Sequence, residues 1–299
     1  MQASILRFFS RVANPFLDTL ANGASFLGEE TFVIAIVLLV FWNISKQKGF
    51  TLYVNVLASV FVMGVLKAIV RAPRPFVVLE DIAGKRITTA TGYSFPSGHT
   101  TTAASFYTTL ALLLKKRAFS IIGAILIVLV GISRLYLGVH WPNDVFGGLV
   151  IGVTFSFILY RWVTQMYEDR VKVIRFCVRY GLIATVAALV LSLLLHSSLI
   201  DPVAFNDLLK TLALAGGGLI GFALEEQFVH YTAKGSLIKK TLRYIIGMAV
   251  VIGIIASKGL FPESVYALSS FVRYTLVGLW ATYLFPLIGT SLHLFGDEQ

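Results

Sequence analysis

Three short polar stretches stand out in this otherwise apolar chain, because their residue types can bind anions and move protons. They are KAIVRAPRP at 67–75, PSGH at 96–99 and SRLYLGVHWPND at 133–144. Ionisable residues at membrane depth are costly, so by default they mark functional sites. Taken alone, each stretch also has a structural interpretation: a basic anchor at a helix end, a capped helix start, and a loop-to-helix junction.

Taken together, the three stretches supply the groups needed for phosphate chemistry. Arginine suits bidentate contact with phosphate, lysine adds a point charge, and a helix N-terminus binds anions through its N–H groups. Two histidines can divide the acid and nucleophile roles near neutral pH. A carboxylate four residues after a histidine can hold one ring nitrogen and leave the other to attack. The predicted phosphate-binding residues are Lys67, Arg74, Ser97, Gly98 and Arg134, and the predicted catalytic residues are His140, His99 and Asp144.

The composition of the chain places these residues in a membrane protein. Of the 299 residues, 57% are hydrophobic and 13% are charged, and the mean hydropathy is +0.82. These values exclude an ordinary soluble domain. Since a crossing helix needs about 20 apolar residues, the length predicts an all-α polytopic bundle of transmembrane helices. We predict about nine spans, at 29–44, 50–68, 97–114, 119–134, 144–162, 178–197, 207–229, 242–258 and 266–293.

The formal charge of +10 indicates membrane sidedness rather than nucleic-acid binding, because the basic residues form no continuous patch with interleaved aromatics. They gather in alternate connections between the predicted spans. By the positive-inside rule these connections face the cytoplasm. The predicted site therefore faces outward, to the periplasm or the cell exterior, and the C-terminus lies inside. The basic groups are Lys46 and Lys48, Lys115 to Arg117, Arg161 to Arg179, and Lys234 to Arg243.

The first 28 residues predict an amphipathic helix that lies in the membrane interface. Apolar residues recur there at helical spacing, with basic residues on the opposite side. The stretch lacks the uninterrupted apolar core and the small-residue cleavage site of a signal peptide. A short first span, which would give ten crossings, is the alternative. The spaced apolar residues are Ile5, Phe8, Val12, Phe16 and Leu20.

The ordered motifs Lys-x6-Arg-Pro, Pro-Ser-Gly-His and Ser-Arg-x5-His-x3-Asp resemble the signature of the type 2 phosphatidic acid phosphatase (PAP2) superfamily. The resemblance covers 67–144 in motifs and 1–165 in architecture. It implies that 1–165 form a phosphatase core of an interfacial helix and five spans. Residues 166–299 then form an additional four-span region of unknown role.

The resemblance also implies a role for each catalytic residue. His140 would attack phosphorus to form a phosphohistidine, Asp144 would orient the ring, and His99 would protonate the leaving oxygen. The phosphate-binding residues would neutralise the remaining phosphate oxygens. No cofactor and no metal is implied, and the cations around the histidines would repel a divalent ion. With Cys177 as the only cysteine, neither an intrachain disulfide nor a thiolate metal cluster is available.

An outward site at the membrane surface indicates a lipid substrate whose tail stays in the bilayer. Phosphatidate, phosphatidylglycerol phosphate and a polyprenyl diphosphate such as undecaprenyl diphosphate all fit. Lys85 and Arg86 could hold a second phosphate or be solvated loop charges, and a homodimer is left open. Glu226 and His230, one helical turn apart, are interpreted as an interface pair rather than a metal or proton site.

Three other functions compete with a lipid phosphatase. The nine spans and an outward N-terminus also resemble the layout of glucose-6-phosphatases, which would make the substrate a sugar phosphate. A vanadate-dependent peroxidase would use the same phosphate pocket, although the apolar spans argue against the soluble haloperoxidases. A non-hydrolytic lipid transporter would need the cations but not the paired histidines.

Overall fold

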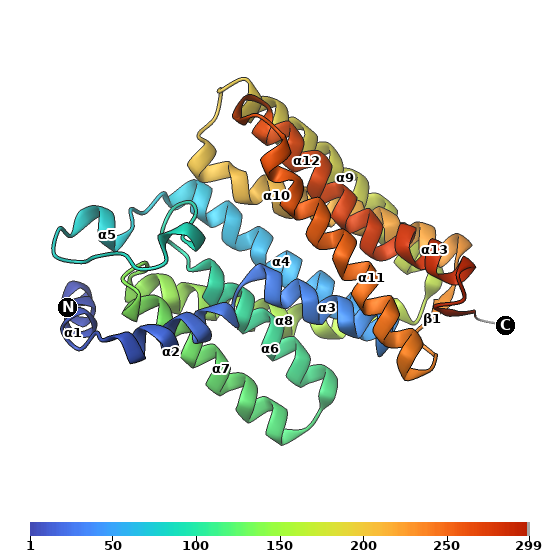
Figure 1. Cartoon of the computed structure of the whole chain (residues 1–299), viewed down its shortest axis with the longest axis horizontal. Helices are drawn as coiled ribbons and strands as arrows, with labels where there is room; N and C mark the ends of the chain where they lie inside the picture. Colours follow the sequence, from blue (N-terminus) through green and yellow to red (C-terminus); the bar gives the residue numbers. More distant parts are fainter. Residues whose placement is uncertain (298–299) are drawn as a thin grey trace. The chain divides into compact units, whose positions relative to one another are not determined.

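The computed structural model describes residues 1–297, and nearly all of its regular structure is helical (Figure 1). The prediction of an all-α membrane bundle is confirmed, with a single two-residue antiparallel pair as the described sheet. The α-helices are α1 (Gln2–Arg11), α2 (Pro15–Phe26), α3 (Glu30–Asn43), α4 (Lys46–Val70), α5 (Pro75–Val78), α6 (Gly98–Leu114), α7 (Arg117–Tyr136), α8 (Pro142–Tyr167), α9 (Arg170–His196), α10 (Pro202–Phe228), α11 (Leu237–Ala256), α12 (Tyr266–Leu279) and α13 (Phe285–Ser291). The short elements are η1 (Ile87–Thr89), η2 (Ser257–Leu260), η3 (Glu263–Val265), the π-turn η4 (Trp280–Leu284), β1 (Tyr231–Thr232) and β2 (Gly296–Asp297).

The predicted count of about nine spans is slightly too high. Within the described residues, seven helical segments are long and apolar enough to cross a membrane, or eight if a bent pair of helices counts as one span. That pair is α2 and α3, which meet at 46°. The sequence count included α3 and α6 as full spans, yet they have only 14 and 17 residues. Hydropathy alone cannot show that these two helices are short, because the apolar residues continue beyond the helix ends into the flanking turns.

The N-terminal prediction of one interfacial helix is wrong, because residues 1–28 form two helices. The break falls at Asn14, whose side chain accepts a hydrogen bond from the Leu17 N–H at 3.0 Å and caps α2. Pro15 follows at the first helical position, where its missing N–H costs nothing. The apolar spacing runs through the break, so periodicity gave no sign of it. Helices α2 and α3 together form either one broken span or a re-entrant loop, and the former corresponds to the alternative of a short first span.

The chain divides into two compact units, one of residues 1–34 and 52–161, the other of residues 35–51 and 162–299. All the predicted site residues lie in the first unit. The predicted division into a phosphatase core of residues 1–165 and an additional region of residues 166–299 stays a prediction.

In the first unit, small residues bring α6 and α8 into backbone contact. A Cβ added to Gly148 would meet the Ser97 carbonyl oxygen at 2.7 Å, and one added to Gly152 would meet the Ala104 Cβ at 2.5 Å. One turn further on, Ser156 donates to the Ser105 carbonyl oxygen at 3.0 Å. Small residues four apart allow this close approach between helices in lipid. The first turn of α8 is thereby fixed against the first turn of α6.

In the second unit, buried charges and aromatic rings connect its helices. Lys46 forms ion pairs with Glu225 at 3.0 Å and Glu226 at 2.9 Å, and Arg170 contacts both Glu226 and His230. Helix α10 ends at Phe228, so His230 lies beyond it and the two residues are not one helical turn apart as the sequence predicted; their interpretation as an interface pair stays a prediction. The indole of Trp42 on α3 donates to the carbonyl oxygen of Ala281 at 2.8 Å, in the π-turn η4 that precedes Pro286.

We expect Gly152→Ala to destabilise the protein, because the new methyl group overlaps the backbone of α6. The free energy of unfolding should fall by about 1–3 kcal/mol, measured by thermal or denaturant unfolding in detergent. The matched control is Gly253→Ala on α11, where an added Cβ meets nothing within 4 Å. Both changes gain the same helix propensity, so equal stability of the two variants would contradict this packing argument.

Candidate active site

The predicted site residues come from the ends of five helices in the first unit and from one loop between them. Lys67 lies in the last turn of α4, and Arg74 immediately precedes α5. Ser97 caps α6, and Gly98 and His99 form its first turn. The remaining three lie around the α7–α8 loop: Arg134 in the last turn of α7, His140 in the loop, and Asp144 in the first turn of α8.

His140 and Asp144 form a buried pair, as the four-residue spacing predicted. The Nδ1 atom of His140 lies 3.3 Å from Oδ2 of Asp144, and the two residues are 1% and 2% exposed. The same carboxylate oxygen accepts from the Ser94 hydroxyl at 2.5 Å and from the Trp141 N–H at 2.7 Å. On the other side of the ring, Nε2 lies 3.2 Å from Nη1 of Arg74. A neutral ring with its proton on Nδ1 satisfies both contacts and gives Nε2 a lone pair.

The surroundings of His140 favour this neutral, nucleophilic form. Burial lowers the pKa of the His140 imidazole well below its usual range, and the cations Arg74, Lys67 and Arg134 lower it further. The ring is therefore available to attack without first losing a proton to solvent.

Lys67 and Arg74 fix the loop that precedes α6. Nζ of Lys67 donates to the Tyr93 carbonyl oxygen at 2.6 Å. Arg74 donates from Nε to the Gly92 carbonyl oxygen at 2.9 Å and from Nη2 to the Thr91 carbonyl oxygen at 2.6 Å. It also reaches the Val139 carbonyl oxygen beside His140 at 2.9 Å. The two cations therefore shape the site through backbone carbonyls, a role that the sequence did not indicate.

Arg134 is the cation with unsatisfied donors in the site. Its side chain is fully buried, and Nη1 donates to the Ser25 hydroxyl at 2.6 Å. Its Nε and Nη2 atoms have no hydrogen-bond partner among residues 1–297. Arg134 acts electrostatically on both His140 and His99. A buried guanidinium with open donors is expected to receive an anion, because an unpaired buried charge is costly.

The start of α6 is fixed by Ser97. Its N–H donates to the Asp144 carbonyl oxygen at 2.9 Å, and its hydroxyl accepts from the Thr100 N–H at 3.4 Å. The N–H groups of Gly98 and His99 have no partner inside the helix by geometry. A Cβ added to Gly98 would meet only the Met63 methyl at 3.7 Å, so the protein itself does not require a glycine here. The space beside Gly98 can admit a ligand close to the helix end.

Three residues that the sequence did not indicate also contribute to the site. Ser94 donates a hydrogen bond to Asp144, Ser25 accepts one from Arg134, and Glu29 lies near His99. Oε1 of Glu29 lies 3.8 Å from Nε2 of His99. Ser94 lies two residues before the second polar stretch, so its position offered a signal. Ser25 and Glu29 lie some 70 and more residues upstream in an apolar context, and only the tertiary structure brings them to the site.

The two loop cations near the site are paired with carboxylates. Lys85 lies 2.5 Å from Asp18, and Arg86 forms an ion pair with Glu29. Arg86 also donates to the Asn22 side-chain oxygen at 3.1 Å. These contacts attach the loop before η1 to α2, and they favour a structural interpretation over a second phosphate site.

Among the described residues, no group of three or more His, Cys, Asp or Glu side chains is placed to hold a metal ion. Metal independence of the reaction stays a prediction.

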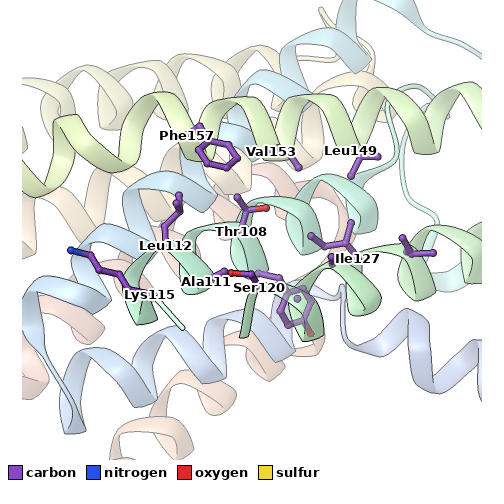
Figure 2. A pocket seen from close by; sticks show the side chains of 13 residues that line it. Thr108, Ala111, Leu112, Lys115, Ser120, Ile127, Leu149, Val153 and Phe157 are labelled. Atoms are coloured by element: carbon purple, nitrogen blue, oxygen red, sulfur yellow. The ribbon is translucent and has the colours of Figure 1, made fainter. Parts of the chain in front are cut away.

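A separate apolar cavity of about 500 Å³ lies among α6, α7 and α8 of the same unit. Figure 2 shows side chains that line it, among them Leu112, Ile127, Val153 and Phe157. None of the predicted site residues lines it. The cavity lies on the helices that carry the site, further along α6 towards Lys115.

The fold and the site together define a multi-pass membrane protein with a cationic, histidine-containing site built on helix ends. Residues 48–168 match the PAP2 superfamily, and residues 209–297 match the transmembrane extension of PAP2 superfamily phosphatases. The two matches together cover more than half of the chain. The chain belongs to the PAP2 superfamily, and its last spans are a recurrent extension within that superfamily.

Several known proteins are similar to this chain. Phosphatidylglycerophosphatase B of Bacillus subtilis is 28% identical over 174 residues, which cover 54% of this chain and 80% of that protein. An undecaprenyl-diphosphatase of Sulfolobus acidocaldarius is 32% identical over 133 residues, which cover 44% of this chain and 62% of that protein. The crystal structure of a transmembrane PAP2-type phosphatidylglycerolphosphate phosphatase from Bacillus subtilis is 26% identical, covers 53% of this chain and 82% of that chain, and has a TM-score of 0.47.

We expect the His140 ring to stay neutral when the pH falls below about 6.5, the ordinary value for histidine. This expectation follows from the lowered pKa of His140, because burial and three cations disfavour the charged form of the ring. Ring ¹⁵N signals of histidine-labelled protein in detergent would measure this, with the His140 signal identified by its loss in His140→Ala. Protonation of this ring at or above pH 6.5 would contradict the electrostatic argument.

Proposed function

We propose that this protein is a membrane phosphatase that hydrolyses lipid phosphates or diphosphates at the outer membrane face through a phosphohistidine. The observation that carries the proposal is the buried Arg134, with open Nε and Nη2 donors, in the same site as the neutral His140. An anion placed on Arg134 and the start of α6 would neutralise an otherwise uncompensated buried charge.

In the proposed reaction, Nε2 of His140 forms a bond to phosphorus while the bond to the leaving oxygen breaks. Asp144 holds Nδ1 and compensates the charge that develops on the ring. His99 donates a proton to the leaving oxygen, and a water molecule then attacks the phosphohistidine to release inorganic phosphate. Arg74 lies 3.2 Å from Nε2 of His140, so a phosphate oxygen near Nε2 would meet the Arg74 guanidinium.

Two observations support a lipid rather than a sugar phosphate as substrate. The relatives include a phosphatidylglycerophosphatase and an undecaprenyl-diphosphatase. The apolar cavity along α6, α7 and α8 lies on the same helices as the site and offers room for a hydrocarbon chain (Figure 2). We therefore propose phosphatidylglycerol phosphate or a polyprenyl diphosphate as the substrate class.

The outward orientation of the site is also a proposal. Within the first unit, the site is formed at the end of α4, the start of α6, the end of α7 and the start of α8. Lys115, Lys116 and Arg117 lie at the opposite end, where α6 passes into α7. The positive-inside rule assigns that end to the cytoplasm.

We expect His140→Ala to lower kcat by at least about a thousandfold, because it removes the nucleophile. Phosphate release would be measured with purified protein in detergent, using phosphatidylglycerol phosphate, undecaprenyl diphosphate, phosphatidate and glucose 6-phosphate. The variant should retain vanadate binding through the cations, and Arg134→Ala should lose it. Release from none of the four substrates by the wild-type protein would argue strongly against the phosphatase function, and near wild-type turnover by His140→Ala would remove this residue from its role.

We expect a cysteine near the site to be labelled from outside the cell and one at the α6–α7 turn to be protected. Cys177 is first replaced by Ala, and Glu80→Cys or Lys116→Cys is then introduced; both positions are exposed. Labelling of intact cells by a membrane-impermeant maleimide measures access from outside. Labelling of permeabilised cells shows whether each introduced cysteine can react with the maleimide when the reagent reaches both sides of the membrane. Labelling of Lys116→Cys but not of Glu80→Cys in intact cells would reverse the proposed orientation.

A further inference from the structure

The elbow between α2 and α3, residues 25–29, packs directly against the start of α6. A Cβ added to Gly28 would meet the His99 carbonyl oxygen at 2.9 Å and the Val130 Cγ1 at 2.7 Å, so only glycine allows this approach. The Tyr107 hydroxyl on α6 donates to the Leu27 carbonyl oxygen at 3.0 Å. The elbow is therefore attached to the same helix that carries His99.

This attachment places the Glu29 carboxylate beside the His99 ring. Oε1 of Glu29 lies 3.8 Å from Nε2 of His99, and the two side chains are only 15% and 12% exposed. Nε2 is buried and has no hydrogen-bond partner among residues 1–297. Arg86 donates to the same oxygen, Oε1, of this carboxylate, and it also donates to the side-chain oxygen of Asn22. The carboxylate is thus oriented independently of the histidine.

The charges around His99 make such a carboxylate necessary for an acid role. The ring is buried, and the guanidinium groups of Arg86 and Arg134 both act on it. Burial and nearby cations disfavour an imidazolium, whereas an adjacent carboxylate favours it. Glu29 is the carboxylate that faces this ring. Its relation to Nε2 of His99 parallels the relation of Asp144 to Nδ1 of His140.

We propose that Glu29 is a positioning residue for the acid step: its carboxylate takes a hydrogen bond from Nε2–H of His99 and favours the protonated form of the ring, so that Nδ1–H is presented to the leaving oxygen. The proposal rests on the proposed phosphatase function. As the phosphorus–oxygen bond breaks, the electron pair passes to the leaving oxygen and the Nδ1 proton follows it. His99 is then neutral, and it regains a proton when it activates the water for the second step. The α2–α3 elbow is accordingly part of the catalytic machinery and not only a membrane anchor.

Substrates with different leaving groups distinguish a role in the acid step from a purely structural role of Glu29. A lipid alcohol is a poor leaving group and needs the proton, whereas p-nitrophenolate leaves without one. We expect Glu29→Gln to lower kcat on phosphatidylglycerol phosphate by about tenfold or more, and on p-nitrophenyl phosphate by less than about twofold. The matched control is Glu30→Gln, because Glu30 is the adjacent, exposed carboxylate at the start of α3. It should leave both rates unchanged.

Two further variants connect the effect to His99. Glu29→Asp keeps the charge and should recover part of the lost rate on phosphatidylglycerol phosphate. In a His99→Ala background, Glu29→Gln should cause no additional loss on that substrate, because residues that act as one unit are not additive. Additive losses would overturn the proposal.

The outcomes separate the two proposals. Wild-type protein that hydrolyses neither substrate would count against the phosphatase function itself. Rates are expressed per folded molecule, as measured by size-exclusion chromatography in detergent, so that misfolding of Glu29→Gln does not imitate a catalytic defect. Wild-type protein that hydrolyses both substrates, with Glu29→Gln losing equal factors on the two, would then overturn the role of Glu29 alone.

Discussion

The arrangement of the first unit depends on the burial of positive charge at one end of its helices. Lys67, Arg74 and Arg134 are all at most 5% exposed, and a buried charge is tolerated only when it is paired or hydrogen-bonded. Lys67 and Arg74 are satisfied by carbonyl oxygens of the loop before α6. Arg134 retains open donors. A buried guanidinium with open donors favours an anion as ligand, which is the physical basis for the proposed phosphate binding.

The same constraint explains why the site contains two histidine–carboxylate pairs. Cations that bind phosphate also favour a neutral imidazole, which suits a nucleophile but opposes an acid. Asp144 lies against His140, where it can support the charge that forms during attack. Glu29 lies 3.8 Å from His99, where it opposes the effect of burial and of the cations and favours the charged form of the ring. In the proposed mechanism, two rings in one field of cations acquire different roles from their different carboxylate geometry.

Small residues in the helices make this concentration of groups sterically feasible. Gly148 and Gly152 bring α8 onto α6, so that the Asp144 carbonyl reaches the Ser97 N–H. Gly28 brings the α2–α3 elbow onto the His99 backbone. In lipid, where apolar contact alone does not draw helices together, close backbone approach and interhelical hydrogen bonds supply the association. The serine contacts of Ser105 and Ser156 belong to this same interface.

The sequence by itself determined the helical membrane class, the eight residues of the three motifs and their convergence, because hydropathy, loop charge and motif order are local properties of the chain. It did not determine the number of spans, since helix length depends on where turns interrupt an apolar run. Nor did it reveal the break at Asn14, because apolar periodicity continues across it. Only the tertiary structure decided that Lys67 and Arg74 bind loop carbonyls while Arg134 keeps open donors. Only the tertiary structure brought Ser25 and Glu29 to the site, because contacts between residues 70 or more apart leave no periodic signal in one sequence.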